Sequence, residues 1–220
     1  QTLFFSATMA PEIERITNTF LSAPIRVEIA RQATASENIR QSVVMFKPKR
    51  KDTEGSEKRK LLRRLIDLEG KKCANAIVFC NRKTDVDICS KSLNKYGYQA
   101  APIHGDLDQA KRTDTLENFR DGGLRILVAS DVAARGLDIP SVSHVFNFDV
   151  PIQAEDYVHR IGRTGRAGAV GKSITFACEI ESFELPKIEK LLGKELKCSL
   201  PPNYLLEKNN KIINNRHTKK

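Results

Sequence analysis

Short, mostly apolar segments alternate with amphipathic segments along most of this sequence, and that alternation limits the folds available to it. The apolar segments AIVFC (76–80), LRILVA (124–129) and GKSITFA (171–177) are five to seven residues long. Strands that lack polar alternation are buried on both faces, which is typical of parallel sheets covered by helices on each side. The sequence therefore predicts an α/β fold with three layers and a mostly parallel sheet.

The remaining elements are predicted from the same patterns. We expect further strands at 39–46, 98–103 and 142–148 and helices at about 59–68, 83–96, 108–120, 154–161 and 181–192. Gly97 ends the helix that precedes it, and Asp108 is a candidate cap for the next one. Residues 47–59 are strongly charged and are predicted to be a loop. Nearer the start of the sequence, we expect a buried strand at 1–5, a helix at 11–21 and a second strand at 25–29.

The stretch HRIGRTGRAG (159–168) carries an arginine at every third position, with glycines between them. A solvated helical face could carry arginines at this spacing, but glycine destabilises a helix interior by about 1 kcal/mol relative to alanine. Glycine is favoured where the backbone turns sharply or approaches a ligand. Guanidinium groups presented from such a turn suit bidentate contact with phosphate oxygens. The stretch therefore indicates a phosphate-facing arginine cluster where a helix passes into a loop.

Two further polar stretches follow predicted strands, where ligands bind in open α/β sheets. HGDLDQAKR (104–112) opens a helix with Gln109 and Arg112 one turn apart, which suits a phosphate site but also an ordinary capped helix. SDVAARGLDIP (130–140) is a more specific signal of a functional site. A capping role for Asp138 and a structural ion pair for Arg135 are the alternatives to a functional role there.

The net charge of the chain indicates what kind of partner it binds, and its cysteines indicate the cellular compartment. The formal net charge of +10 favours a polyanionic partner, although part of the excess lies in charged loops and in the terminal residues RHTKK. The five cysteines show no CxxC spacing, so we expect reduced thiols, no zinc site and a cytoplasmic protein. No apolar run approaches the roughly 20 residues that span a bilayer, and no signal peptide is evident, so no membrane association is expected.

Together these stretches resemble the motifs of the DEAD-box RNA helicases, in the same order along the chain. The matching stretches are QTLFFSATM (motif III), NRK at 81–83 (motif IV), HGDLDQAKR (motif IVa), SDVAARGLDIP (motif V) and HRIGRTGRAG (motif VI). The resemblance implies the end of helicase domain 1 at 1–30, a linker at 31–38, a RecA-like (P-loop NTPase-like) domain 2 at 39–200 and a basic tail at 201–220. It also implies an RNA-stimulated ATPase that bends single-stranded RNA.

The resemblance further implies a role for individual residues. Arg163 and Arg166 are expected to act as catalytic arginine fingers on the γ-phosphate of ATP. The residues expected to bind ATP with them are Gly136 and Asp138. Those expected to contact the RNA sugar–phosphate backbone are Gly105, Arg112 and Ser130. Those expected at the interdomain cleft are Ser6, Thr8, Arg135, His159 and Arg160.

Two pieces of an ATPase site are missing from the sequence. GRAGAVGKS (165–173) looks like a P-loop, but Arg166 occupies the position of its first glycine, and the segment leads into a strand instead of a helix. No DEAD or similar acidic tetrapeptide is present. We therefore expect domain 1 in cis to hold ATP and Mg²⁺, no metal site in this chain, and no ATP turnover by the chain alone. The alternatives are a DNA helicase of the same superfamily, and a non-catalytic RecA-like module that binds RNA or a protein.

Overall fold

One parallel sheet organises the larger part of the chain. In the computed structural model, which describes residues 2–6, 11–27, 37–135, 137–166, 168–202 and 205, the strand order is β3-β4-β2-β5-β6-β1-β7. The strands are β1 (Ile39–Met45), β2 (Ala76–Phe79), β3 (Ala100–Ile103), β4 (Ile126–Ala129), β5 (His144–Asn147), β6 (Gly171–Ala177) and β7 (Cys198–Ser199). Every pairing in this sheet is parallel, which confirms the predicted sheet type.

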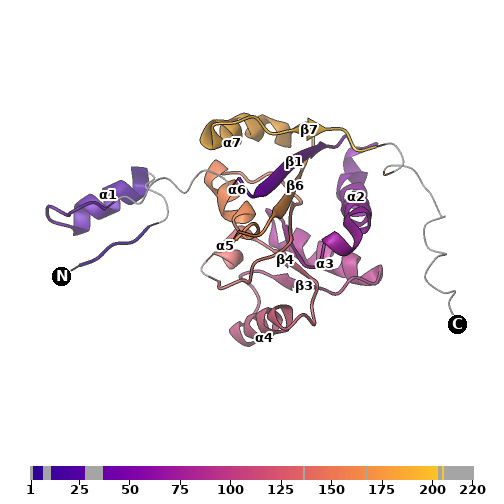
Figure 1. Cartoon of the computed structure of the whole chain (residues 1–220), viewed down its shortest axis with the longest axis horizontal. Helices are drawn as coiled ribbons and strands as arrows, with labels where there is room; N and C mark the ends of the chain where they lie inside the picture. The colour runs from indigo at the N-terminus through magenta and orange to yellow at the C-terminus, as the bar shows by residue number, and fades with distance from the viewer. Residues whose placement is uncertain are drawn as a thin grey trace, which may run out of the picture. The chain divides into compact units, whose positions relative to one another are not determined.

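Helices cover both faces of the sheet, so the predicted three layers are confirmed (Figure 1). The helices of this part are α2 (Glu54–Glu69), α3 (Lys83–Lys95), α4 (Gln109–Arg120), α5 (Asp131–Ala134), α6 (Ala154–Ile161) and α7 (Leu185–Leu192). Apolar side chains of α2 and α3 pack on one face. Those of α6 and α7, and those of α4 and α5, form two clusters on the other face.

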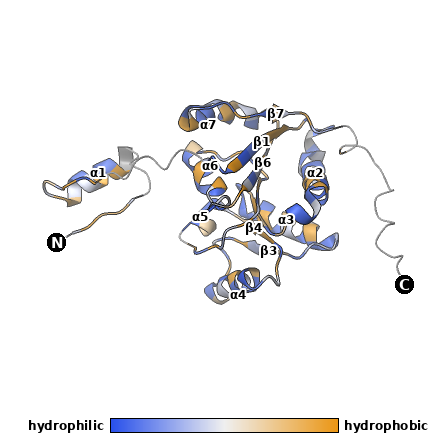
Figure 2. Ribbon diagram, viewed as in Figure 1, coloured by the Kyte–Doolittle hydropathy of each residue, from blue (hydrophilic) through white to orange (hydrophobic). Residues whose placement is uncertain are grey.

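Strands β2 and β4 are apolar throughout because their alternate side chains enter different clusters. In β2, Ala76 and Val78 pack with α2 and α3, whereas Ile77 and Phe79 pack with α4 and α5. The helices have only one buried face, and Figure 2 shows hydrophobic and hydrophilic residues alternating along α2, α4 and α7. This difference in burial is the physical basis of the sequence pattern.

Helix α2 begins earlier than the charge pattern predicted. Residues 51–53 form a 3-10 turn, η1, and α2 starts at Glu54, so the expected loop at 47–59 is wrong in its second half. The Thr53 hydroxyl donates to the Glu57 carboxylate at 2.6 Å, which stabilises this first turn. The side chain of Lys58 is buried here despite its charge, because two carboxylates from other segments accept hydrogen bonds from it.

The C-terminal elements also differ from expectation. The predicted helix at 181–192 begins with a 3-10 turn, η3 (Glu181–Glu184), before α7. Strand β7 was not predicted; it pairs with β1 through Val43 and Val44. Of the predicted tail at 201–220, the structure describes residues 201, 202 and 205, and Leu205 is buried in the cluster beneath α2.

The first residues form a separate unit, Gln1–Gln32. Helix α1 (Pro11–Phe20) matches the helix predicted there. The two predicted strands are wrong where the structure describes them, since 2–6 and 25–27 carry no strand and Ile25 is 93% exposed. A strand requires a neighbour for its backbone groups, and no described residue pairs with these segments. Residues 28–36, which include most of the predicted linker, lie outside the described part.

Candidate functional site: an arginine-rich edge of the sheet

Polar side chains gather at the carboxyl edge of the sheet. Asn81 follows β2, Asp131 follows β4, and Asp149 follows β5. Strand β2 lies between β4 and β5, so these three ends are neighbours. In parallel sheets this edge is where ligands bind, because several loops converge on it.

Arg160, near the end of α6, joins these strand ends. Its Nε and Nη2 each donate to a carboxylate oxygen of Asp131 at 2.6 Å, a bidentate ion pair. Its Nη2 also donates to Asn81 Oδ1 at 2.7 Å, and its Nη1 donates to the Asp149 carbonyl at 2.7 Å. The guanidinium lies over the Phe79 ring, 5.4 Å from its centroid. One side chain thus connects the ends of three strands to α6.

The environment of Arg160 adds a structural role to the one expected for it. It is among the residues expected at the interdomain cleft and it lines the pocket described below, but its side chain is 1% exposed, and its guanidinium is bonded to groups of its own domain. The fixed fork of the guanidinium suits this bidentate contact, which a lysine could not reproduce. Arg160 therefore holds the arginine motif in place from inside the domain.

The turn after α6 depends on close backbone packing. Thr164 pairs with Val142 in an isolated parallel bridge, and its hydroxyl donates to the Val142 carbonyl. Gly165 has a positive φ of 69°, and a Cβ there would lie 2.6 Å from Ile39 Cγ1. A Cβ at Gly171 would overlap the Thr164 hydroxyl and the backbone nitrogen of Gly165. Gly165 therefore permits the sharp turn predicted for the glycines of the motif, and Gly171, which was not predicted, permits close packing against that turn.

Arg163 and Arg166 differ from Arg160 in their partners. Arg163 donates to the carbonyls of Ala134 and Leu137 at 3.2 and 3.3 Å. Arg166 is exposed and donates to the Gly162 carbonyl at 2.7 Å and the Ile139 carbonyl at 3.3 Å. Within the described part of the chain, neither guanidinium pairs with a carboxylate. Partial burial and then the adjacent Arg166 charge lower the pKa of Arg163, so an anion placed between them would be stabilised.

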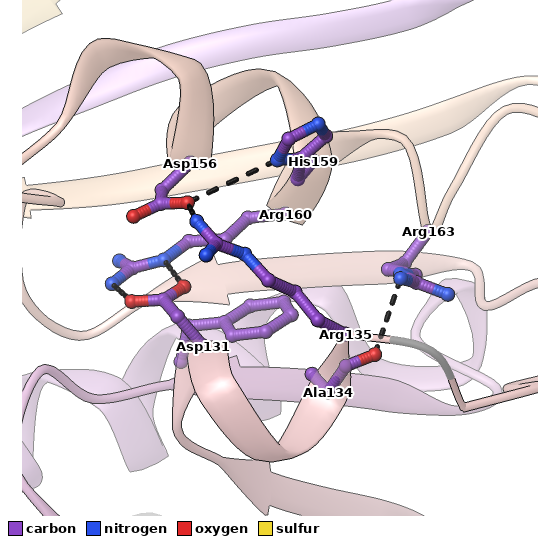
Figure 3. Close-up of a pocket in the computed structure, with 8 residues that line it drawn as sticks. Asp131, Ala134, Arg135, Asp156, His159, Arg160 and Arg163 are labelled. Carbon is purple, nitrogen blue, oxygen red and sulfur yellow. Dashed lines mark hydrogen bonds and ion pairs between the residues drawn. The ribbon is translucent and has the colours of Figure 1, made fainter. Parts of the chain in front are cut away.

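A pocket opens beside these arginines (Figure 3). Its lining residues are Phe79, Asp131, Ala134, Arg135, Asp156, His159, Arg160 and Arg163. Arg135 forms an ion pair with Asp156, and His159 Nδ1 lies 3.9 Å from the same carboxylate. Burial, followed by the charges of Arg135 and Arg163, lowers the pKa of His159, so its imidazole is neutral at neutral pH. The structure therefore brings together the arginines expected in the cleft and the histidine beside them.

The segment after α5 approaches the arginine turn through its carbonyl groups. Asp138 lies in this segment with its side chain 96% exposed, and Arg120 contacts its carboxylate at 3.4 Å and its carbonyl at 3.2 Å. Its neighbour in the predicted ATP site, Gly136, lies outside the described residues, as does Thr8 of the predicted interdomain set. Ser6, in the other unit, is exposed.

Of the three residues expected at RNA, Gly105 and Ser130 lie just after β3 and β4, and Arg112 lies in the first turns of α4. Gly105 is exposed, and a Cβ there would meet open space. Ser130 is buried, and its N–H donates to the Ile103 carbonyl at 3.2 Å, which links the two strand ends. Arg112 donates to Gln109 Oε1 at 3.2 Å on the first turns of α4. The cap predicted for this helix is confirmed, since Asp108 Oδ1 accepts from the Lys111 N–H at 2.8 Å.

Four residues of this edge were given no individual role by the sequence argument, although the first two lie in the stretches matched to motifs IV and V: Asn81, Asp131, Asp149 and Asp156. The first three had a usable signal, because each follows an apolar strand by one or two residues, as the expected residues do. Asp156 had none, since an acidic residue in the first turn of a helix is ordinary. Its contact with Arg135 depends on the tertiary packing of α5 against α6.

Metal-binding and membrane-spanning features are the other properties of this part of the chain. Among the described residues, Glu54, Cys178 and Glu181 form one group whose ligand atoms could surround a metal ion. Glu181 already accepts hydrogen bonds from Lys58 there. Across the same described ranges, no helix has both the length and the apolar character required to cross a bilayer.

The sequence of this chain matches a known protein family and is similar to known helicases. The family described as "Helicase conserved C-terminal domain" matches residues 57–168. The ATP-dependent RNA helicase RhlB of Pseudomonas syringae pathovar tomato is 44% identical over 206 residues, which cover 94% of this chain and 50% of RhlB. The chain thus spans about half the length of this relative.

Solved structures share the fold. Escherichia coli DEAD-box protein SrmB, solved bound to regulator of ribonuclease activity A, is 32% identical with a TM-score of 0.69, covering 78% of this chain and 95% of that one. Saccharomyces cerevisiae Dbp5, solved bound to RNA and ADP BeF3, is 27% identical with a TM-score of 0.75, covering 92% and 54%. The chain therefore belongs to the DEAD-box RNA helicases, whose conserved C-terminal helicase domain it contains.

Proposed function

We propose that this domain completes the ATPase site of an ATP-dependent RNA helicase, with Arg163 and Arg166 acting on the γ-phosphate of ATP. One observation carries this proposal. Both guanidiniums rest on backbone carbonyls at the carboxyl edge of the sheet, without a carboxylate partner among the described residues. A phosphate offers a stronger, charge-assisted acceptor than a neutral carbonyl, so these side chains are available to it.

The remaining ATP contacts fit the same cleft. The exposed carboxylate of Asp138 is suited to accept hydrogen bonds from the ribose hydroxyls, and Gly136 lies between it and Arg135 in the sequence. The neutral imidazole of His159 and the guanidinium of Arg135 line the pocket where a second domain would contact this one. Support for a second domain comes from RhlB, which is about twice as long as the matched chain.

ATP and Mg²⁺ would be held by helicase domain 1 in cis. The sequence contains no GxxxxGK[ST] loop and no DEAD tetrapeptide, the elements that cradle the phosphates and bind Mg²⁺. Mg²⁺ would neutralise charge on the phosphates, while the arginines of this chain stabilise the charge that develops during transfer. We infer that the 220-residue chain alone does not turn over ATP.

RNA would lie along the ends of β3 and β4, with its sugar–phosphate backbone contacted by Gly105, Arg112 and Ser130. The absence of a Cβ at Gly105 permits close approach of a backbone, and the net charge of +10 favours a polyanion. Contacts of this kind read little sequence and weaken as the salt concentration rises. The names of the relatives, which specify RNA helicases, favour RNA over DNA.

The test is Arg166→Ala in the full-length protein. Loss of an arginine finger lowers turnover by about 10³- to 10⁵-fold, and we expect a decrease in RNA-stimulated ATP hydrolysis within that range. RNA affinity should be largely retained. Arg50→Ala is the matched control, because Arg50 is an exposed arginine that pairs only locally with Asp52. Unchanged turnover in Arg166→Ala would refute the assignment, and stronger activation by DNA than by RNA would favour a DNA helicase.

A further inference from the structure

Lys58 is a buried cation that the proposed chemistry does not use. Its side chain in α2 is 2% exposed, and its ammonium donates to Asp149 Oδ1 at 3.0 Å and to both carboxylate oxygens of Glu181 at 2.9 Å. The ammonium also lies 5.2 Å from the centroid of the Phe148 ring. Burial opposes the charge, but the two carboxylates outweigh it and raise the pKa of Lys58 to about 12.

Burial of this charge is not needed to attach α2 to the sheet. Four neighbouring apolar side chains of the helix are already in the core: Leu61, Leu62, Leu65 and Ile66. Buried ion pairs are often no more stabilising than apolar residues of similar volume, so their presence is weak evidence for a stabilising role. The contacts of Lys58 instead support a role in fixing the positions of its two carboxylate partners.

Asp149 connects Lys58 to the arginine motif. One carboxylate oxygen accepts from Lys58, and the other accepts from the Asn81 N–H at 2.9 Å. The carbonyl of the same residue accepts from Arg160 Nη1 at 2.7 Å. Asn81 in turn accepts from Arg160 Nη2 through its side chain and donates to the Val150 carbonyl at 2.9 Å. Asp149 is therefore held on one side by Lys58 and holds Arg160 on the other.

We propose that Lys58 is a positioning residue for the arginine motif: through Asp149 and Asn81 it fixes Arg160, and with it the turn that presents Arg163 and Arg166. The expected effect of Lys58 on catalysis rests on the proposed function. The structural coupling of Lys58 to Arg160 does not. Arg160 is two residues from the turn at Gly162, so a shift of its guanidinium displaces the fingers that follow.

The two partners of Lys58 separate this role from simple stabilisation. Glu181 belongs to η3 and also accepts from the Cys178 N–H, so its contact with Lys58 leads away from the arginines. The contact with Asp149 leads to Arg160. Glu181→Gln should therefore lower stability without moving Arg160, whereas Lys58→Met should move it. Met is chosen because it is long, unbranched and fills the space with little strain.

The first measurement is made on the 220-residue chain by NMR of the arginine Nε–H groups. The Arg160 Nε–H, buried and bonded to Asp131, should exchange slowly with solvent. We expect Lys58→Met to shift this signal and to speed its exchange by about tenfold or more, with Glu181→Gln close to wild type. A folded Lys58→Met chain whose Arg160 signal and exchange rate match the wild type would overturn the proposal.

A double variant covers the case in which Lys58→Met does not fold. Lys58→Met with Glu181→Gln keeps the net charge of the cluster equal to that of the wild type, which removes the cost of an extra unpaired carboxylate. The same shift of the Arg160 signal is expected, and its absence counts against the proposal.

Steady-state kinetics of the full-length protein give the second readout. We expect Lys58→Met to lower kcat about 10- to 100-fold at a temperature where the protein is folded, with KM for ATP little changed, because misplaced groups affect the transition state most. An unchanged kcat overturns the catalytic consequence. The NMR measurement does not involve ATP. It therefore tests the coupling of Lys58 to Arg160 even if the Arg166→Ala experiment refutes the proposed function.

Discussion

The three arginines of the motif should contribute very unequally to the stability of the isolated chain. Replacing Arg160 by methionine removes four hydrogen bonds and leaves the Asp131 carboxylate, 21% exposed, without its partner. Breaking a buried pair in this way costs about 3–5 kcal/mol. For a domain of this size each kcal/mol lowers the melting temperature by about 2–4 °C, so we expect a decrease of about 6–20 °C.

Arg166→Met is the matched comparison within the same motif. Arg166 is exposed and bonds only to carbonyls, so its replacement should change stability by no more than about 0.5 kcal/mol, or about 1–2 °C. Thermal unfolding of both variants followed by circular dichroism, with urea titrations to check that the m-value is unchanged, measures the difference. Equal shifts for the two variants, or a shift of less than about 2 °C for Arg160→Met, would refute the division into a structural and a ligand-facing arginine.

Two further predictions concern the packing of the turn and the opposite edge of the sheet. Gly171→Ala should destabilise the chain by about 1–3 kcal/mol, because its Cβ would overlap the Thr164 hydroxyl. Urea titration should give a lower unfolding midpoint, and an unchanged midpoint would show that the turn is not closely packed. Burial opposes ionisation of Glu69, but the hydrogen bonds from Lys172 and His144 outweigh it and lower its pKa, and burial lowers the pKa of His144. Each group therefore adds stability that is present above its unfolded pKa, about 4.3 for Glu69 and about 6.5 for His144, and is lost as the pH falls through its lower folded pKa. Replacing His144 by glutamine removes the imidazole and one of the donors that lower the Glu69 pKa, so the melting temperatures of His144→Gln between about pH 7 and pH 4 should fall less steeply than those of the wild type; parallel curves would contradict this.

The sheet was predictable because its strands are buried on both faces. Strands β2 and β4 are continuous apolar segments, and helices with one apolar face separate the strands along the chain. The apolar segments at 2–6 and 25–27 have similar composition but no strand beside them in the described residues, and they carry no strand. Composition identifies a segment that can form a strand, whereas pairing decides whether it does.

Charged residues were the harder part of the prediction. Lys58 lies within a run of charged residues, yet it is buried because its partners come from 91 and 123 residues away in the sequence. The arginine motif shows the same limit in another form. Its regular spacing gave no indication that Arg160 is buried, Arg163 half-buried and Arg166 exposed. Those differences arise from how α6 packs against the strand ends.

The carbonyl contacts of Arg163 and Arg166 also have a kinetic consequence. A guanidinium held by a carboxylate would have to break an ion pair before it could engage a ligand, and it would resist leaving that partner in every cycle. A neutral carbonyl can be exchanged for phosphate at small cost and taken up again when the phosphate departs. If the two arginines act on phosphate as proposed, these resting contacts would keep both side chains ordered between turnovers while leaving engagement and release fast, as repeated opening and closing of two domains requires.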